Sequence, residues 1–363
     1  MTGRTSPSRS SGASEHELPD PDLASGVFSL IWMLTLIALR LIRTRREGIF
    51  QRRRDTITDA MSRILWDETG AAVIDNKRLW KSQMVPEVFL GFVALVRGEE
   101  RERLIDRLIG NDVDDQFRRL LHHRRKSVRF AAVEALAYFP GLSTARSVDA
   151  LIENTKAADI RIAGMRTLVS IGSYPLVPDV MAELSHPNAS ARRLQSVLSG
   201  LALHRLQDLL EYLQRPGISD TERACLLEAL GASTDYSVLA TLQAALQDEA
   251  PTIRAAALEG LADLAHPDAA PAIALCLRDS DWNVRAAAIR ALRESAGYAY
   301  ASEISGLLSD PVWLVQFESA QALVDMGAPG RNLLESSARG PDESVSRTAS
   351  LALAELGFAG ERP

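Results

Sequence analysis

The chain of 363 residues is 46% hydrophobic but only 6% aromatic, and its formal net charge is -6. That hydrophobic fraction suffices for a sizeable core, which must consist mainly of Ala, Leu, Val and Ile. Strand-favouring runs are scarce and Ala, Leu, Glu and Arg are abundant, so the composition predicts an all-α fold and argues against a β-rich one.

The charge is unevenly distributed along the chain. Residues 40–129 carry 21 basic and 14 acidic side chains, whereas residues 130–363 carry 18 basic and 29 acidic ones. Binding to nucleic acid depends on neutralising phosphates, so we expect no nucleic-acid partner for the acidic part. Cys225 and Cys276 are too few for a disulfide framework, which indicates a reducing compartment.

The N-terminal region predicts a tail followed by a membrane anchor. Residues 1–22 are rich in Ser, Pro and Gly without apolar periodicity, and we expect a disordered tail. Leu23–Leu39 contains no charge, and Leu41 and Ile42 extend the run beyond Arg40. At about 1.5 Å per residue, residues 23–42 are just long enough for a single transmembrane helix. A cleaved signal peptide is disfavoured because acidic residues precede the run and arginines follow it, and a buried or interfacial helix stays an alternative.

The arginines after this run predict its orientation. They outnumber the basic residues of the tail, and they are Arg40, Arg43, Arg45, Arg46, Arg52, Arg53 and Arg54. Because the more basic flank faces the cytoplasm, we expect a single-pass protein of the cell membrane with its N-terminus outside and the rest of the chain inside. The same arginines either contact anionic lipid headgroups or serve only as the topology signal. Residues 43–126 follow as a basic juxtamembrane segment and a divergent helical cap, with a helix break near Gly98.

An internal repeat dominates the rest of the chain. The same pattern of residues restarts every 30 to 32 positions, at Val128, Ile160, Ala191, Glu222, Ile253, Val284, Val315 and Val345. The eighth residue after each start is Leu in seven of the eight copies, and small residues dominate the third, fourth and seventh positions. These positions share one face of a helix, so each copy predicts an amphipathic helix with an Ala-rich packing side. A second helical stretch and a proline-containing turn fit between copies, which predicts units of two antiparallel helices.

The iterated motif of Asp, then Val-Arg, Ala and Ala-Leu resembles the HEAT-repeat superfamily. It is most similar to the short repeats, about 31 residues long, of phycobilin-lyase-like proteins, and the likeness covers about residues 127–357 of a repeat domain at 127–363. The resemblance implies a right-handed α-solenoid of two-helix repeats. It also implies structural pairs between an Asp and the Arg six residues later, here Asp248 with Arg254 and Asp279 with Arg285. Elsewhere the pairs are incomplete, and Asp310, for example, precedes Gln316.

Motifs for chemistry are not found in the sequence. No His, Cys, Asp or Glu cluster has the spacing of a metal site, and no phosphate-binding glycine loop or Ser-His-Asp arrangement is suggested. The only His-Glu dipeptide is His16-Glu17 in the tail, so we expect no iron site of the kind that HEAT-like hydroxylases build from such pairs. We therefore expect no catalytic residue, no metal and no cofactor. A phycobilin-lyase-like or other repeat-based enzyme or chaperone that acts on a protein substrate remains the alternative.

The surface of the second helices is the best candidate for binding a protein partner. The sixth position after each start points away from the packing side, and these residues are Glu134, Arg166, Val197, Glu228, Glu259, Arg290, Gln321 and Leu351. They form either a partner groove or a merely solvated face. Trp282 and Trp313 lie two residues before their starts, and they indicate either an interaction edge or packing of the turns. The sequence thus predicts a membrane-anchored scaffold that binds a protein partner, such as another protein of the same membrane, at the cytoplasmic face.

Overall fold

The computed structural model describes residues 21–66, 77–186, 191–295 and 297–360. These residues form α-helices and short 3₁₀ helices (η), and no strand occurs among them. The all-helical prediction is therefore confirmed for this part of the chain. The chain divides into two units, Met1–Trp66 and Asp67–Pro363, and each is described by itself.

The first unit contains one long helix, α1 (Pro21–Trp66). It continues without a break past residue 42, where the expected transmembrane helix ends. Among the residues that the structure describes, no helix is both long and apolar enough to cross a membrane. The predicted anchor at 23–42 is thus not confirmed, and most of its side chains lie outside the described residues. The same holds for the predicted tail up to residue 20 and for the side chains of Arg43, Arg45 and Arg46, whereas Arg40 and Arg52 to Arg54 are exposed.

The second unit begins with four helices that do not follow the repeat. They are α2 (Lys77–Trp80), α3 (Val85–Val93), α4 (Gly98–Ile109) and α5 (Val113–Leu120). The predicted break lies between α3 and α4, where Gly98 takes a φ of 58° that side chains other than glycine rarely adopt. Phe89, Phe117 and Phe139 pack against one another with ring centroids 5.4 to 5.6 Å apart. This aromatic core joins α3 and α5 to the turn after the first repeat helix.

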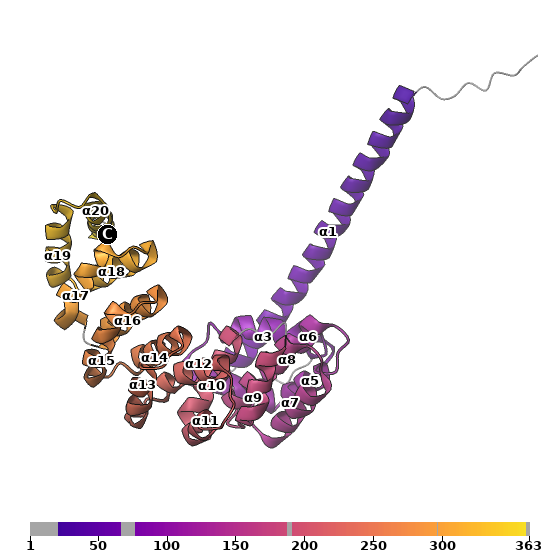
Figure 1. Ribbon diagram of the computed structural model, residues 1–363. Coiled ribbons are helices and arrows are strands. Elements are labelled where there is room, and N and C mark those ends of the chain that lie inside the picture. The colour runs from indigo at the N-terminus through magenta and orange to yellow at the C-terminus, as the bar shows by residue number, and fades with distance from the viewer. Residues whose placement is uncertain (1–20, 67–76, 187–190, 296, 361–363) are drawn as a thin grey trace, which may run out of the picture. The chain divides into compact units, whose positions relative to one another are not determined.

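The eight predicted second helices are all present. They are α6 (Lys126–Leu136), α8 (Ala158–Ser170), α10 (Ala191–His204), α12 (Asp220–Leu230), α14 (Pro251–Leu264), α16 (Trp282–Ser295), α18 (Trp313–Asp325) and α20 (Glu343–Gly360). The helices that alternate with them are α7 (Leu142–Asn154), α9 (Val177–Ala182), α11 (Leu206–Leu213), α13 (Leu239–Ala245), α15 (Ala270–Leu275), α17 (Ala301–Gly306) and α19 (Ala328–Ala338). Several of these are short and end in a 3₁₀ turn, as α15 does at Cys276–Arg278. Figure 1 shows α14, α16 and α18 on the inner side of a curved row and α13, α15, α17 and α19 on its outer side.

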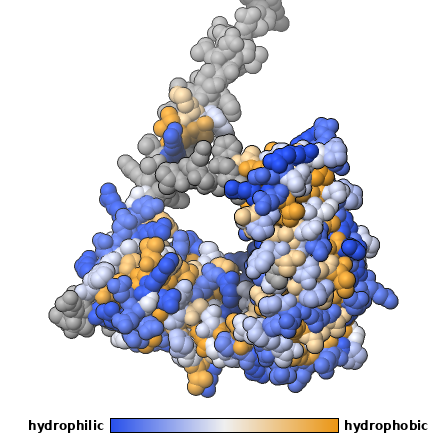
Figure 2. Space-filling view, turned by 90° about the vertical axis from the view of Figure 1, so that its left-hand side faces the viewer, coloured by the Kyte–Doolittle hydropathy of each residue, from blue (hydrophilic) through white to orange (hydrophobic). Residues whose placement is uncertain are grey.

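The small residues of the repeat allow the second helices to pack closely. The repeated Leu is almost completely buried in six of its seven positions, for example Leu261 and Leu292, while Leu353 is partly buried. A Cβ atom at Gly260 of α14 would lie 2.4 Å from the backbone oxygen of Leu227 in α12. Only glycine permits that approach. Such packing leaves the polar residues of each helix on the surface, where Figure 2 shows mainly hydrophilic side chains between smaller apolar areas.

Candidate partner-binding surface

A ladder of ion pairs connects neighbouring units of the repeat. In each step an Arg near the start of a second helix reaches an acidic residue in the segment that precedes the next second helix. The pairs are Arg161 with Glu183 at 2.6 Å, Arg223 with Asp248 at 2.9 Å, Arg254 with Asp279 at 2.7 Å and Arg285 with Asp310 at 2.7 Å. Most of these side chains are largely buried. The ladder holds the units at a fixed spacing and leaves little of its charge available to a partner.

The sequence predicted that Asp248 and Asp279 each pair with the Arg six residues later in the same unit. This prediction was wrong for their carboxylates. Arg254 contacts Asp248 only through the backbone oxygen of Asp248, at 2.9 Å, and Arg285 contacts Asp279 in the same way. The carboxylate of Asp279 instead accepts a hydrogen bond from the amide of Asp281 and pairs with the Arg of the preceding unit. The Asp carboxylate accepts a hydrogen bond within its own turn, and it therefore points toward the preceding repeat unit and not toward the Arg that follows it in the same unit. Arg161 and Arg223 take part as well, so the ladder is longer than the sequence indicated.

The environment of the ladder keeps its aspartates charged. Burial alone would raise the pKa of Asp279 and of Asp310, but hydrogen bonds from Arg254 and Arg285 and from backbone amides bring each pKa below its usual value. The pKa of Asp248 is also lowered, chiefly by the amide of Ala250 and further by Arg223. These groups are therefore structural anions at neutral pH.

The residues of the sixth position pair largely with one another. Glu134 forms an ion pair with Arg166 of the next unit, and Glu259 forms one with Arg290. The Arg290 guanidinium also lies 3.3 Å from Glu318 of α18. Four of the eight sixth-position residues are thus engaged in ion pairs with one another, which partly neutralises the charge of this face.

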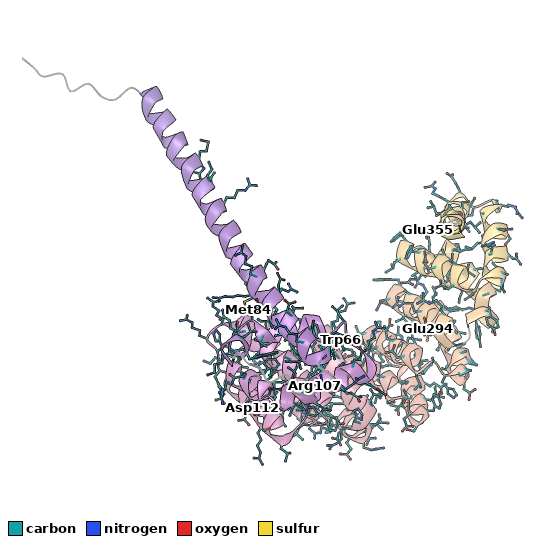
Figure 3. All side chains as sticks on the ribbon, turned by 180° about the vertical axis from the view of Figure 1, so that it is seen from behind. Trp66, Met84, Arg107, Asp112, Glu294 and Glu355 are labelled. Atoms are coloured by element: carbon teal, nitrogen blue, oxygen red, sulfur yellow. The ribbon has the colours of Figure 1, made fainter. Side chains whose placement is uncertain are left out.

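Three other sixth-position residues, Gln321, Val197 and Leu351, carry no charge. Gln321 donates a hydrogen bond to Glu355 at 3.1 Å. Val197 is completely buried, so its inclusion among the surface residues was wrong. The buried residues of α10 include Leu194, Val197, Leu198 and Leu201, and each lies one position earlier relative to Ala191 than the buried residues of the other copies lie relative to their starts. Leu351 of α20 is exposed. Figure 3 labels Glu294 and Glu355, which lie in α16 and α20 of the same row of helices.

Glu228 of α12 is a sixth-position residue whose negative charge is not neutralised by a described cation. Burial, together with repulsion from Glu259 and Asp263, raises its pKa. The pKa of Asp263 in α14 is raised in the same way by partial burial and by Glu259 and Glu294. Within the described part of the chain, neither carboxylate has an ion pair or hydrogen bond. Asp263 is not among the residues that the repeat pattern predicted for this surface, although it lies four residues after Glu259 and therefore on the same helix face.

Trp282 and Trp313 begin α16 and α18 and remain on the surface. Trp282 is 42% exposed and Trp313 is 67% exposed, so both offer surface to solvent, and Trp282 is more than half covered by its surroundings. Trp313 stacks on Phe317 with ring centroids 5.4 Å apart, and this pair adds an aromatic patch to the start of α18. Exposed aromatic pairs of this kind are suited to contact with another molecule.

No group of three or more His, Cys, Asp or Glu that could hold a metal occurs among the residues that the structure describes. Cys225 and Cys276 are free and buried, and burial raises the pKa of the Cys276 thiol to about 11. A thiol with such a pKa stays protonated at neutral pH and is a poor nucleophile.

Comparison with known proteins identifies the repeat. The family model for HEAT repeats matches residues 206–293 and 271–354, which confirms HEAT repeats in the C-terminal part of the chain. No match to a curated protein was found. Similar solved structures include an engineered protein, at 15% identity, 83% coverage of this chain, 98% of that chain and a TM-score of 0.33.

Two natural proteins are also among the similar structures. Kap121p, a karyopherin, bound to Pho4p has 14% identity, with 71% of this chain and 34% of that chain covered and a TM-score of 0.45. The complex of CpcE and CpcF of phycocyanin lyase from Nostoc sp. PCC7120 has 17% identity, 66% and 94% coverage and a TM-score of 0.34. Likenesses at this level concern the helical fold and carry nothing about activity.

Proposed function

Because its C-terminal part is built from HEAT repeats, we propose that this chain is a non-enzymatic scaffold that binds a protein partner along the row of second helices. The observation that carries the proposal is the uncompensated pair of Glu228 and Asp263. Both carboxylates have raised pKa values because like charges surround them and water is partly excluded. A Lys or Arg of a partner would remove this repulsion, which gives the surface a preference for a basic segment.

The exposed aromatic residues of the same row supply further contact area. Trp282 and Trp313 belong to α16 and α18, which follow α14 in the row. Aromatic side chains at an interface bury a large area at a small entropic cost, and they also accept cation–π contacts from Lys or Arg. The chemistry of the surface therefore fits a partner segment in which basic and apolar residues alternate.

Cross-linking in native membranes tests this binding role. The partner captured by the unaltered chain is compared with that captured by a Glu228→Gln, Asp263→Asn double variant, which removes both charges without changing shape. Glu303→Gln, on the exposed surface of α17, is the matched control. We expect the double variant to lose the partner, the control to retain it, and helical content to be equal in all three. Undiminished capture by the double variant would contradict the proposed surface.

The proposal further assigns the scaffold to the cytoplasmic face of the cell membrane, with residues 23–42 as its anchor and another protein of that membrane as its partner. An uncharged apolar run followed by a cluster of arginines supports this. The side chains of Trp32, Met33, Leu36 and Ile37 in α1 are all exposed, which is unusual for residues of this kind in water.

Labelling with a membrane-impermeant thiol reagent tests the topology. Cys225 and Cys276 are replaced by Ser, and single cysteines are introduced at Ser11 in the tail or at the exposed Ala240. On intact cells we expect the first to react and the second to react only after permeabilisation. The opposite pattern, or recovery of the chain in the soluble fraction, would refute the anchor.

A further inference from the structure

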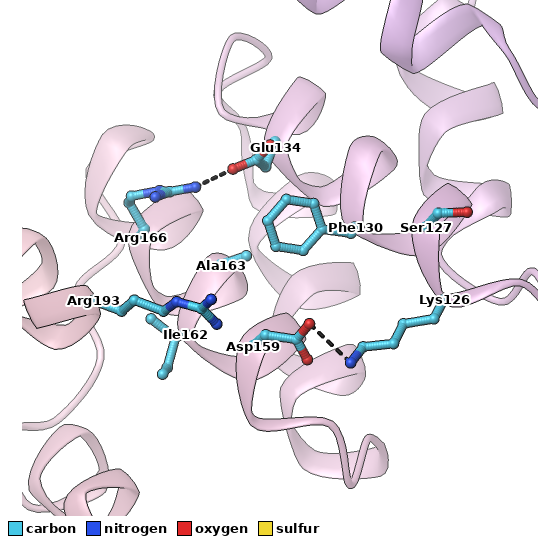
Figure 4. Close-up of a pocket in the computed structure, with 9 residues that line it drawn as sticks. All are labelled: Lys126, Ser127, Phe130, Glu134, Asp159, Ile162, Ala163, Arg166 and Arg193. Atoms are coloured by element: carbon cyan, nitrogen blue, oxygen red, sulfur yellow. Dashed lines mark hydrogen bonds and ion pairs between the residues drawn. The ribbon is translucent and has the colours of Figure 1, made fainter. Parts of the chain in front are cut away.

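A cavity of about 520 Å³ lies between α6, α8 and α10, at the N-terminal end of the repeat. Its charged walls are Lys126, Glu134, Asp159, Arg166 and Arg193, and its apolar walls include Phe130, Ile162 and Ala163. Figure 4 shows the ring of Phe130 and the guanidinium of Arg193 directed into the same space. Glu228 of α12 and Asp263 of α14 do not line this cavity.

One positive charge in this cavity is left without a counter-charge. Lys126 forms an ion pair with Asp159 at 2.9 Å, and Arg166 forms one with Glu134. The guanidinium of Arg193 is exposed and has no ion pair or hydrogen bond to any residue that the structure describes. Three cations and two carboxylates therefore line the cavity, and a single negative charge would balance them.

The charge pattern restricts the ligand to a single anionic group. A carboxylate can take two parallel hydrogen bonds from Arg193, which is the favoured geometry between these groups. A phosphate or a nucleic-acid backbone would bring more negative charge close to Glu134 and Asp159, and repulsion would oppose it.

The remaining walls favour an apolar group beside that carboxylate. Ile162 and Ala163 are almost completely buried and form the floor, and the Phe130 ring is half-buried beside them. An aliphatic or aromatic side chain packed against this ring would be removed from water.

A second cavity indicates that the ligand is extended. It has about 380 Å³, and Glu134 and Arg166 line it as well as the first, so their ion pair forms a common wall. The remaining walls of the second cavity offer an apolar surface with hydroxyl groups, and they are Leu90, Ala137, Tyr138, Thr167 and Ser170. Two adjoining cavities suit several consecutive residues of a chain better than one small molecule.

We propose that this double cavity binds a short peptide segment of a partner protein that carries one Asp or Glu beside a large apolar side chain. Arg193 holds the carboxylate, and Phe130 packs against the apolar neighbour. This site is separate from Glu228 and Asp263, the carboxylate pair of α12 and α14. It binds an acidic segment, whereas that pair favours a basic one.

Binding of defined peptides to the full chain in detergent tests the site. The probe is a library of fluorescent nonapeptides with a central Glu or Asp between randomised apolar residues, paired with a library that carries Gln or Asn at the centre. We expect acidic peptides to be enriched. For an enriched peptide, fluorescence polarisation should show about tenfold weaker binding after Glu→Gln in the peptide, since one charge-assisted contact is lost.

Variants of the chain assign the contact to Arg193. Arg193→Ala should weaken binding about tenfold, because it removes the partner of the carboxylate. Arg192→Ala removes the same charge from the neighbouring exposed residue, which does not line the cavity, and should bind as the unaltered chain does. Glu228→Gln should also have no effect, which separates this site from the proposed acidic surface.

Three results would overturn the proposal: no preference for acidic over amide peptides, equal losses for Arg192→Ala and Arg193→Ala, or stronger binding of phosphoserine peptides than of acidic ones.

Discussion

The guanidinium of Arg254 forms two parallel hydrogen bonds with the carboxylate of Asp279, from Nε to Oδ2 at 2.8 Å and from Nη2 to Oδ1 at 2.7 Å. The same geometry recurs one unit later between Arg285 and Asp310, at 2.7 and 2.8 Å. Each pair joins one two-helix unit to the next, so the ladder contributes to the nearest-neighbour contacts on which the stability of a solenoid depends.

Removal of a ladder carboxylate should destabilise the solenoid. Asp279→Ala leaves Arg254 largely buried without its counter-charge, and we expect the free energy of unfolding to fall by about 3 kcal/mol. Urea denaturation followed by circular dichroism measures the change. Glu343→Gln breaks the exposed pair with Arg347, whose side chains are 90% and 70% exposed, and should cost at most about 0.5 kcal/mol. Equal effects of the two substitutions would show that the ladder is not structural.

Acid should weaken the ladder. The pKa values of Asp248, Asp279 and Asp310 are lowered in the folded chain, so their contribution to stability is complete above the unfolded value, about 3.9. It is lost as the pH falls further, through the lowered folded values. Thermal melting between pH 2 and 7 should therefore show a steep loss of stability below about pH 4. In the Asp310→Asn variant, the loss of stability below about pH 4 should be less steep. An unchanged steepness would contradict the contribution of Asp310 to the ladder.

The effect of Glu228 on stability should depend on pH in the opposite sense to that of the ladder aspartates. Its pKa is raised, so the stability linked to its protonation is present below the unfolded value and is lost as the pH rises through the folded value. Glu228→Gln removes the repulsion by Glu259 and Asp263, and we expect it to raise the stability at pH 7 by about 0.5 kcal/mol. The gain should shrink as the pH is lowered. A Gln variant less stable than the unaltered chain at pH 7 would mean that Glu228 has a stabilising contact.

The close approach of α12 and α14 should not tolerate a methyl group. Gly260→Ala places a Cβ atom 2.4 Å from the backbone oxygen of Leu227, which cannot rotate away, and we expect a loss of about 1 to 3 kcal/mol. Gly306→Ala in α17 is the control, since no atom lies within 4 Å of its Cβ position. There the better helix propensity of Ala should leave the stability unchanged or raise it by up to about 1 kcal/mol. Comparison of the two melting temperatures checks the prediction.

The order of the repeat could be predicted from the sequence because it depends on local periodicity. Apolar and small residues that recur on one helix face identify a helix without knowledge of its neighbours. The starts from Val128 to Val345 therefore marked all eight second helices correctly. The membrane-spanning role of residues 23–42 rests on the same kind of reasoning, and it remains a prediction.

The contacts between units were decided by the tertiary structure alone. Which Asp meets Arg254, and that Arg193 faces a cavity with Phe130, both depend on how one unit packs against the next. That packing results from the contacts of many small side chains, among them Gly260 against α12, and no short motif encodes it. The helices could be placed from the sequence because they follow from neighbours in the chain, although the register assigned to the copy in α10 was one residue off. The binding surfaces depend on neighbours in space, and for that reason only the folded structure could define them.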